Sequence, residues 1–211
     1  MAKVAEIKQE NIIRSAINIF AEKGLEQASM EAIAKQAEVS KRTLYKYYPT
    51  KDSLFSVIVD RLLDGCKVMK TLTFDPNLEI RSQLVAIAQK EVTLLCQTEF
   101  LSLSRMVMTE CIRSNVIANI MLERLQNLEG GYSFEQWIEN ANAADKLTVP
   151  HPQIAAEQFF ASLKAVVFWP QILMHQPIAS EQQQQLAITC AVDQFLAAYM
   201  PKKNSKRRLL I

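Results

Sequence analysis

The stretch VSKRTLYKYYPTKDSLF, residues 39–55, describes a short helix with defined ends. Ser40 is a preferred N-cap residue, because its hydroxyl can accept one of the backbone N–H groups that a first helical turn leaves free. Pro49 disfavours helical geometry in the residue before it, so the helix is expected to stop by Tyr48. A helix of roughly two turns is marginal in water by itself. We therefore expect neighbouring helices to hold it in place.

The two faces of this short helix differ in chemistry. At about 100° per residue, Leu44 and Tyr48 share one side, which is expected to pack on the core. The other side is cationic, hydrogen-bonding and aromatic, and carries Lys41, Arg42, Thr43, Tyr45, Lys46 and Tyr47. Residues 39–51 hold four positive charges and no acid, whereas residues 54–200 hold ten basic and fifteen acidic side chains. Although the formal charge of the chain is only +2, its distribution predicts that this helix contacts a polyanion.

Two further helices are predicted before this one. Residues 29–37 begin with the N-cap residue Ser29 and present an apolar face, and a three-residue turn separates them from the short helix. This arrangement predicts a helix-turn-helix. Apolar side chains at three- and four-residue spacing from Ile12 to Phe20 predict a first helix that ends at Gly24 and supports the pair. Residues 1–10 are polar and are expected to fray.

The remaining sequence predicts an all-α fold. Gly is scarce (4), and no sustained alternation of apolar and polar residues suggests strands. Helices are expected over 54–63, 78–96, 100–111, 114–128, 133–144, 153–168 and 180–200, with breaks at Pro76, Gly130–Gly131, Pro152, Pro170 and Pro201. With 211 residues, the chain has room for a second core. We predict an N-terminal helix-turn-helix DNA-binding domain at 1–50 and a larger C-terminal helical domain at 51–211.

The segment from Ile12 to Phe55 resembles the DNA-binding domain of the tetracycline-repressor (TetR) family, with its VSKxTLYxYFxxKxxLF signature. The resemblance covers about the first quarter of the chain, and the remainder is similar only in its helix pattern. It implies a sequence-specific DNA-binding transcriptional regulator, a homodimer that represses from a pseudo-palindromic operator and is released by a small hydrophobic ligand. At Glu38 the family often has Gly, so the turn is expected to need a left-handed residue, at a strain of about 1 kcal/mol.

The resemblance also assigns roles to the residues that face DNA. Its base-reading positions correspond to Lys41, Arg42, Thr43 and Lys46. Its phosphate-binding positions correspond to Tyr45, Tyr47 and Lys51. Ser29 is expected to add a phosphate contact at the N-terminus of its helix, and the cap residue Ser40 belongs to the same surface. The alternative is a merely solvated face, which the capped ends and the aromatic side chains among the cations disfavour.

The last two predicted helices are more apolar than the surface helices of a monomer. In the family that the chain resembles, the final two helices of each subunit form a four-helix bundle across the dimer. The interface residues expected on this basis are Phe160, Leu163, Val167, Ile188, Val192 and Phe195. The alternative is that these side chains fill the core of one chain.

A ligand pocket is implied by the resemblance and not by the spacing of any residues. The expected lining residues lie on the middle helices and are Gln89, Phe100, Arg105, Met106, Thr109, Met121, Phe159 and Trp169, with Met108 and Phe168 as further apolar candidates. Each of them also fits a core position. The abundance of Met and aromatic side chains favours a hydrophobic effector.

Other functional classes find little support in the sequence. No Ser-His-Asp order, Gly-rich phosphate loop or HExxH motif occurs, so no catalytic residue, metal or cofactor is expected. No secretion signal or apolar run of about 18 residues occurs, which predicts a cytoplasmic protein. The alternative function is a constitutive or architectural helix-turn-helix protein that binds DNA without an effector.

Overall fold

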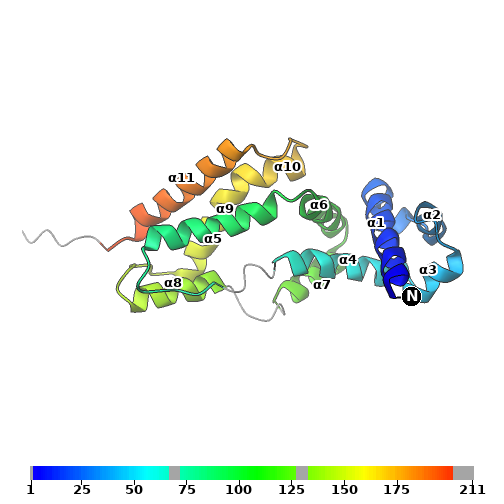
Figure 1. The fold of residues 1–211 in the computed structure, drawn as a ribbon, viewed down its shortest axis with the longest axis horizontal. Helices are drawn as coiled ribbons and strands as arrows, with labels where there is room; N and C mark the ends of the chain where they lie inside the picture. The colour runs from blue at the N-terminus through cyan, green and yellow to red at the C-terminus, as the bar shows by residue number, and fades with distance from the viewer. Residues whose placement is uncertain (1, 67–71, 127–132, 202–211) are drawn as a thin grey trace, which may run out of the picture. The chain divides into compact units, whose positions relative to one another are not determined.

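The computed structural model describes residues 2–66, 72–126 and 133–201, and all regular structure over these ranges is α-helical (Figure 1). The described residues divide into two compact units. One unit comprises residues 2–66 and 97–126, and the other comprises residues 72–96 and 133–201. The predicted all-α fold is confirmed.

The first unit holds the helix-turn-helix. Its described helices are α1 (Ala2–Gln27), α2 (Met30–Gln36), α3 (Lys41–Tyr47), α4 (Lys51–Cys66), α6 (Thr98–Arg113) and α7 (Asn115–Gln126). Helix α1 packs against α2, α4 and α6, while α2 packs against α3 and α6 packs against α7. Ile12, Ile33, Leu44 and Leu54 are completely buried, so each of the first four helices contributes to the core. The predicted support of the helix-turn-helix by a first helix is confirmed.

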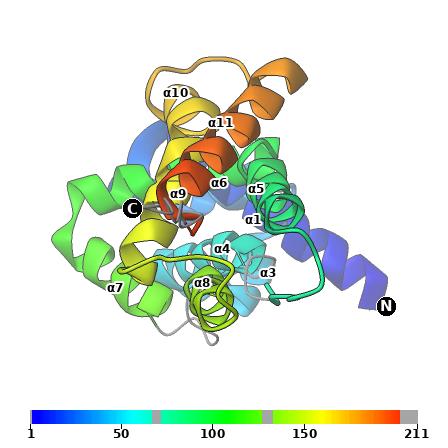
Figure 2. The same cartoon turned by 90° about the vertical axis from the view of Figure 1, so that its left-hand side faces the viewer.

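The second unit is built around three long helices that contact one another pairwise. Its described helices are α5 (Ile80–Leu95), α8 (Ser133–Ala143), α9 (Pro152–Val167), α10 (Trp169–Leu173) and α11 (Glu181–Tyr199). Helices α5, α9 and α11 run side by side in both views (Figures 1 and 2). An aromatic cluster fills the space between α8, α9 and α11, with ring centroids 5.0–5.9 Å apart among Phe134, Trp137, Phe159, Phe160 and Phe195.

Two helix starts differ from the prediction. Helix α1 begins at Ala2, so the expected fraying of residues 1–10 is wrong for the described residues 2–10. An ion pair from Glu10 to Arg61 of α4, at 2.8 Å, ties this part of α1 to the unit. Helix α5 begins at Ile80 and not near Leu78, because the side chain of Asp75 accepts the N–H of Asn77 at 2.8 Å and so stabilises a turn before it.

One helix was missed. Pro170 was expected to end the apolar helix, but it lies in the first turn of α10, where a proline is tolerated because no backbone N–H is needed there. The capping box predicted for the last helix is confirmed, since Ser180 and Gln183 exchange both hydrogen bonds. The helix end predicted at Gly130–Gly131 lies outside the described residues.

The predicted division at residue 50 concerns function and stays a prediction. By packing alone, α4, α6 and α7 belong to the same unit as the helix-turn-helix. None of the helices in the described part of the chain is both long and apolar enough to cross a membrane.

Candidate nucleic-acid interface

Helix α3 is held at both ends by hydrogen bonds that its own sequence supplies. The hydroxyl of Ser40 accepts the N–H of Thr43 at 3.1 Å and lies 2.8 Å from the Thr43 hydroxyl. At the other end, the N–H of Tyr48 donates to the carbonyl of Leu44 at 2.8 Å. The predicted cap at Ser40 and the stop before Pro49 are therefore confirmed.

The buried side of α3 is narrow. Leu44 is completely buried and Tyr48 is 7% exposed, as the helical spacing predicts. Burial is also the main cause that raises the pKa of the Tyr48 hydroxyl, with smaller contributions from Glu10 and Tyr47. The other side presents the expected surface: Lys41, Arg42, Tyr45 and Lys46 are exposed, and Thr43 and Tyr47 are half-buried. Three cationic side chains and one tyrosine are therefore exposed to solvent on α3, away from its buried side.

The turn between α2 and α3 contains the left-handed residue that the family resemblance implied. Glu38 has a φ of 55°, in the left-handed region that disfavours a side chain with a Cβ. The N–H of the next residue, Val39, donates to the carbonyl of Ala34 at 3.0 Å, which fixes the turn at the end of α2. At the other end of α2, the Ser29 hydroxyl accepts the N–H of Ala32 at 3.1 Å and confirms the predicted cap.

The cations of α3 differ in their partners. The ammonium of Lys41 lies 3.2 Å from a carboxylate oxygen of Glu31 on α2, in a pair whose members are both exposed. A backbone hydrogen bond and this lysine together lower the pKa of Glu31. The ammonium of Lys46 lies 6.0 Å from the ring centroid of Tyr47. No acidic partner engages Arg42 or Lys46 within the described ranges, so both are available to an anionic ligand.

Lys51 is engaged in a way that the sequence did not indicate. Thr50 and Ser53 cap the start of α4 reciprocally, with the N–H of Ser53 donating to the Thr50 hydroxyl at 3.0 Å. In the next position, the Lys51 ammonium donates to the carbonyls of Leu25 and Glu26, at 2.8 and 2.6 Å. Lys51 thus binds the C-terminal end of α1, and its predicted phosphate contact stays a prediction.

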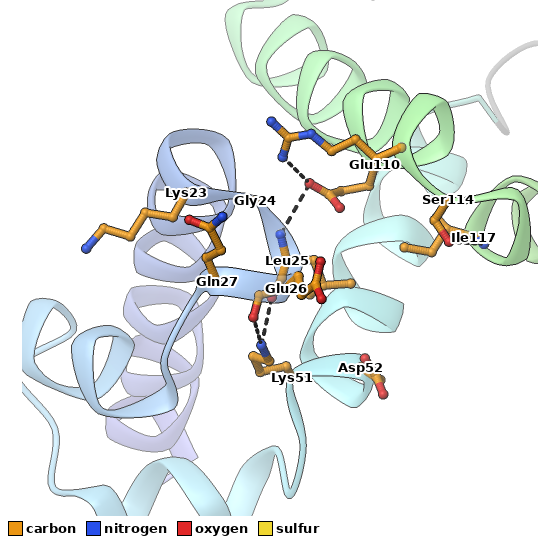
Figure 3. A pocket seen from close by; sticks show the side chains of 11 residues that line it. Lys23, Gly24, Leu25, Glu26, Gln27, Lys51, Asp52, Glu110, Ser114 and Ile117 are labelled. Atoms are coloured by element: carbon orange, nitrogen blue, oxygen red, sulfur yellow. Dashed lines mark hydrogen bonds and ion pairs between the residues drawn. The ribbon is translucent and has the colours of Figure 1, made fainter.

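A cavity of about 660 Å³ opens beside these contacts, within the first unit (Figure 3). Its wall mixes cationic and acidic side chains and includes Lys23, Glu26, Lys51, Asp52, Glu110 and Arg113. Glu110 is buried, and its carboxylate accepts the N–H of Leu25 at 3.2 Å and an N–H of Arg113 at 3.1 Å. Sequence reasoning missed Glu110, because its partner lies 85 positions away in the chain.

The predicted ligand-binding residues are divided between the two units. Four lie on α6, namely Phe100, Arg105, Met106 and Thr109, and Met121 lies on α7. Gln89 lies on α5, Phe159 on α9 and Trp169 on α10. Phe159 is a member of the aromatic core cluster, whereas Gln89 and Trp169 are exposed. The cavity beside Lys51 is lined by none of the eight, and their role as ligand contacts stays a prediction.

Most of the residues predicted for the dimer interface are buried within the second unit. Leu163, Val167, Ile188, Val192 and Phe195 are at most 5% exposed, and Phe160 is half-buried against Phe134. A side chain without exposed surface cannot contact a second copy, so the five buried residues contribute to the core of the second unit, where α5, α9 and α11 pack together. Phe160 keeps some exposed surface, and its place in an interface stays a prediction. Helical spacing identified the apolar faces of α9 and α11 correctly but not what covers them. The alternative of a single-chain core fits the burial of these five positions.

Comparisons with known proteins agree with this geometry. Residues 12–58 match the family described as bacterial regulatory proteins, tetR family. Residues 82–201 match the family described as AefR-like transcriptional repressor, C-terminal domain. Together these two matches include α3 and nearly all of the second unit.

Similar proteins cover most of the chain. A TetR family transcriptional regulator from Pseudomonas syringae pv. tomato str. DC3000 has a solved structure with a TM-score of 0.80 and 34% identity, over 92% of this chain and 96% of that one. The flavonoid-responsive regulator FrrA has a TM-score of 0.67 and 27% identity, over 92% and 98%. The probable HTH-type transcriptional regulator YttP of Bacillus subtilis (strain 168) is 30% identical, over 77% of this chain and 76% of its own length.

Two shorter matches, to other Bacillus subtilis regulators, span only 32% and 29% of those proteins. Their matched segments are 63 and 84 residues long. The capped helix-turn-helix, the helical second unit and the family match over residues 82–201 lead to one conclusion: the chain belongs to the TetR family of bacterial regulatory proteins.

Proposed function

We propose that the protein is a sequence-specific DNA-binding transcriptional repressor. The observation that carries this proposal is the exposed cationic face of α3, on a helix whose ends are capped and whose opposite side is buried. Such a helix keeps its side chains in a fixed arrangement, as reading bases in the major groove requires. Because a bacterial repressor acts on DNA in the cytoplasm, we propose a cytoplasmic location.

The proposed contacts divide into two kinds. Arg42 and Lys46 read bases, because both are exposed and have no acidic partner in the described part of the chain, and Lys41 and Thr43 support them. Contacts to phosphates come from Tyr45, Tyr47, Lys51, Ser29 and Ser40. For the last two, the hydroxyl already caps a helix, so the helix N-terminus itself supplies N–H groups to the phosphate.

We propose that the protein binds DNA as a homodimer through the exposed faces of α9 and α11. Helix α9 exposes Ile154 (50%) and Val166 (41%), and α11 exposes Leu186 (62%), on the surfaces that the core does not use. Small exposed residues on the same helices, Ala161 and Ala165 on α9 and Ala197 on α11, allow close helix packing. Two copies would then present their α3 helices to half-sites about one helical turn apart, or roughly 34 Å.

The proposed effector is a small hydrophobic molecule that releases the protein from its operator. The half-buried and buried apolar side chains of α6 and α7, including Met106 and Met121, support this class of ligand. FrrA, with 27% identity, responds to flavonoids, which are aromatic compounds. The alternative is a constitutive DNA-binding protein without an effector.

A binding titration tests the DNA-binding proposal. The parent protein is first used to select a preferred duplex from a random pool, and affinity for that duplex and a scrambled one is then measured at two salt concentrations. We expect a preference of at least about 10³-fold for the selected duplex, and a salt dependence in both. Arg42→Ala should lower the preference, whereas Lys90→Ala, at an exposed position on α5, should leave it unchanged. Equal affinity for both duplexes would favour the architectural alternative.

The interface is tested separately, by sedimentation of two leucine variants. Leu186 on α11 and Leu78 before α5 are exposed to similar degrees, 62% and 57%. We expect the parent and Leu78→Glu to sediment as dimers. Leu186→Glu should sediment as a monomer, because it places a charge in the proposed interface. A dimer that survives Leu186→Glu would move the interface away from α11.

A further inference from the structure

The cavity beside Lys51 is lined by equal numbers of positive and negative side chains. It is enclosed by the end of α1, the start of α4 and the junction between α6 and α7, all within the first unit (Figure 3). The cations are Lys23, Lys51 and Arg113, and the acids are Glu26, Asp52 and Glu110. A lining without net charge disfavours both a simple anion and a polyamine, because each of these meets like charges as well as opposite ones.

Two of these six charges already have partners within the wall of the cavity. The Lys51 ammonium donates to the carbonyls of Leu25 and Glu26, at 2.8 and 2.6 Å, where the C-terminal end of α1 is negative. The Glu110 carboxylate is buried and accepts the N–H of Leu25 at 3.2 Å and an N–H of Arg113 at 3.1 Å. Lys51 and Glu110 therefore serve the fold of the wall.

Arg113 supplies the cationic side of the cavity. Its guanidinium lies in space that a Cβ on Gly24 would fill, and its contact with Glu110 holds it there. The side chain is nevertheless 57% exposed. A guanidinium has several N–H donors, of which the contact with Glu110 uses one. The remaining donors can bind a carboxylate in the forked geometry that arginine favours, and because the group is already held in place, little of its freedom is lost on binding.

Glu26 and Asp52 supply the acidic side of the cavity. Both side chains are exposed, and within the described part of the chain neither carboxylate forms a hydrogen bond or an ion pair. The neighbouring Lys51 ammonium binds backbone carbonyls and not these carboxylates. Glu26 and Asp52 are therefore available to an ammonium group of a ligand.

We propose that this cavity binds a small zwitterion whose ammonium and carboxylate are separated by several bonds, as in an ω-amino acid or a dipeptide. The carboxylate of the ligand contacts Arg113, and its ammonium contacts Asp52 and Glu26. The chain between the two charges lies against Leu25 and Ile117, which add apolar surface to the same cavity. A volume of about 660 Å³ suits a small molecule. None of the residues predicted for the hydrophobic effector lines this cavity, so the site is separate from that proposal and does not rest on the proposed function.

Isothermal titration calorimetry on the full chain, without DNA, tests the site with ε-aminocaproate as the probe. The matched controls are caproate, which lacks the ammonium, and hexylamine, which lacks the carboxylate. We expect ε-aminocaproate to bind one site per chain, and each control to bind this site at least about tenfold more weakly, because one charged side of the cavity then stays unpaired. The proposal is overturned if ε-aminocaproate does not bind at millimolar concentrations.

Variants on the acidic side show where the probe binds. Asp52→Asn and Glu26→Gln should each weaken ε-aminocaproate by at least about fivefold and leave caproate unchanged, because caproate has no ammonium. Glu22→Gln, which replaces an exposed acid of α1 outside the cavity, is the control and should bind both probes as the parent does. Caproate also suits the hydrophobic effector proposed above, and binding there does not depend on these acids. Equal affinity of all variants for ε-aminocaproate, or an equal loss for both probes, rejects the site.

The cationic side is tested with a paired substitution. Arg113→Met by itself would leave the buried Glu110 carboxylate without its cation, so it is combined with Glu110→Gln, which keeps an acceptor for the N–H of Leu25. Compared with Glu110→Gln alone, the double variant should bind ε-aminocaproate at least about fivefold more weakly and hexylamine equally well. Urea unfolding checks that both variants are folded. If the double variant binds ε-aminocaproate as tightly as Glu110→Gln does, Arg113 does not hold the carboxylate and the proposal fails.

Discussion

The ammonium of Lys41 on α3 and the carboxylate of Glu31 on α2 form an ion pair at 3.2 Å, with both side chains exposed. The pair places a negative charge at the edge of the cationic face. The family resemblance assigns Lys41 to base reading, and in this structure its ammonium is paired with Glu31. The carboxylate on α2 therefore partly neutralises the positive charge that α3 presents.

Glu31→Gln should therefore strengthen DNA binding. The substitution removes a carboxylate from the approach of the phosphate backbone and releases Lys41, so affinity for selected and scrambled duplexes should rise by a similar factor, on the order of a few fold at low salt. Fluorescence anisotropy at two salt concentrations measures this. Glu139→Gln, an exposed acid on α8, is the matched control and should have no effect. Unchanged or weaker binding by Glu31→Gln would mean that the pair positions Lys41 for its contact.

Leu44 and Tyr45 should separate stability from binding. Leu44→Ala empties a completely buried site and should lower the free energy of unfolding by about 2 to 5 kcal/mol. Tyr45→Ala, at a position 43% exposed, should change stability by less than about 1 kcal/mol but weaken DNA binding. Urea unfolding and a duplex titration on both variants provide the comparison. The assignment of faces fails if Tyr45→Ala is the more destabilised of the two.

Replacing Glu38 by glycine should stabilise the protein, although glycine usually destabilises regular structure. Its φ of 55° is costly for a residue with a Cβ, so Glu38→Gly should raise the free energy of unfolding by up to about 1 kcal/mol. The same change in a regular helix has the opposite effect. Glu22→Gly, at an exposed position within α1, should lower the free energy of unfolding by about 1 kcal/mol. Thermal or urea unfolding checks both signs, and a destabilised Glu38→Gly would show that the turn is not strained.

The Glu91–Lys164 pair should make stability depend on pH. Burial raises the pKa of Glu91 above its ordinary value of about 4.3, although Lys164, at 3.6 Å, partly opposes the shift. A raised pKa in the folded state means that the folded state binds more protons than the unfolded state between the two pKa values. Stability is therefore greatest below the unfolded pKa and falls as pH rises through the folded pKa.

Glu91→Gln should remove the loss of stability that accompanies rising pH. Lys164→Met should make that loss larger, because the buried carboxylate then has no cation beside it. Unfolding by urea at a series of pH values from about 4 to 8 measures the three curves. Lys146→Met, on a lysine outside this pair, serves as the control. Curves of equal slope for parent and Glu91→Gln would show that the Glu91 pKa is not raised.

Local features were predictable from the sequence, because their causes lie within a few residues. The caps at Ser29, Ser40 and Ser180 depend on neighbours at most four positions away. The left-handed residue at Glu38 was expected from the family resemblance. The buried side of α3 followed from helical spacing alone. For the same reason, the all-α fold and the helix-turn-helix could be predicted without the structure.

Features that depend on distant partners were not predictable. Nothing around Lys51 indicates that its ammonium binds carbonyls of residues 25 and 26, and nothing around Glu110 indicates its contact with Leu25. The choice of interface residues also depends on distant partners. An apolar face looks the same in sequence whether a helix of the same chain or a second copy covers it, and here α5 and its neighbours cover Ile188 and Val192.

Only one of the seven residues of α3, Leu44, is buried. The remaining six can therefore change identity without emptying the core, provided that the cap at Ser40 and the buried Tyr48 remain. This division separates what the helix recognises from what keeps the protein folded. On the proposed function, operator preference can then diverge rapidly between related proteins, and replacing Lys41, Arg42, Thr43 or Lys46 should change that preference on an unchanged scaffold.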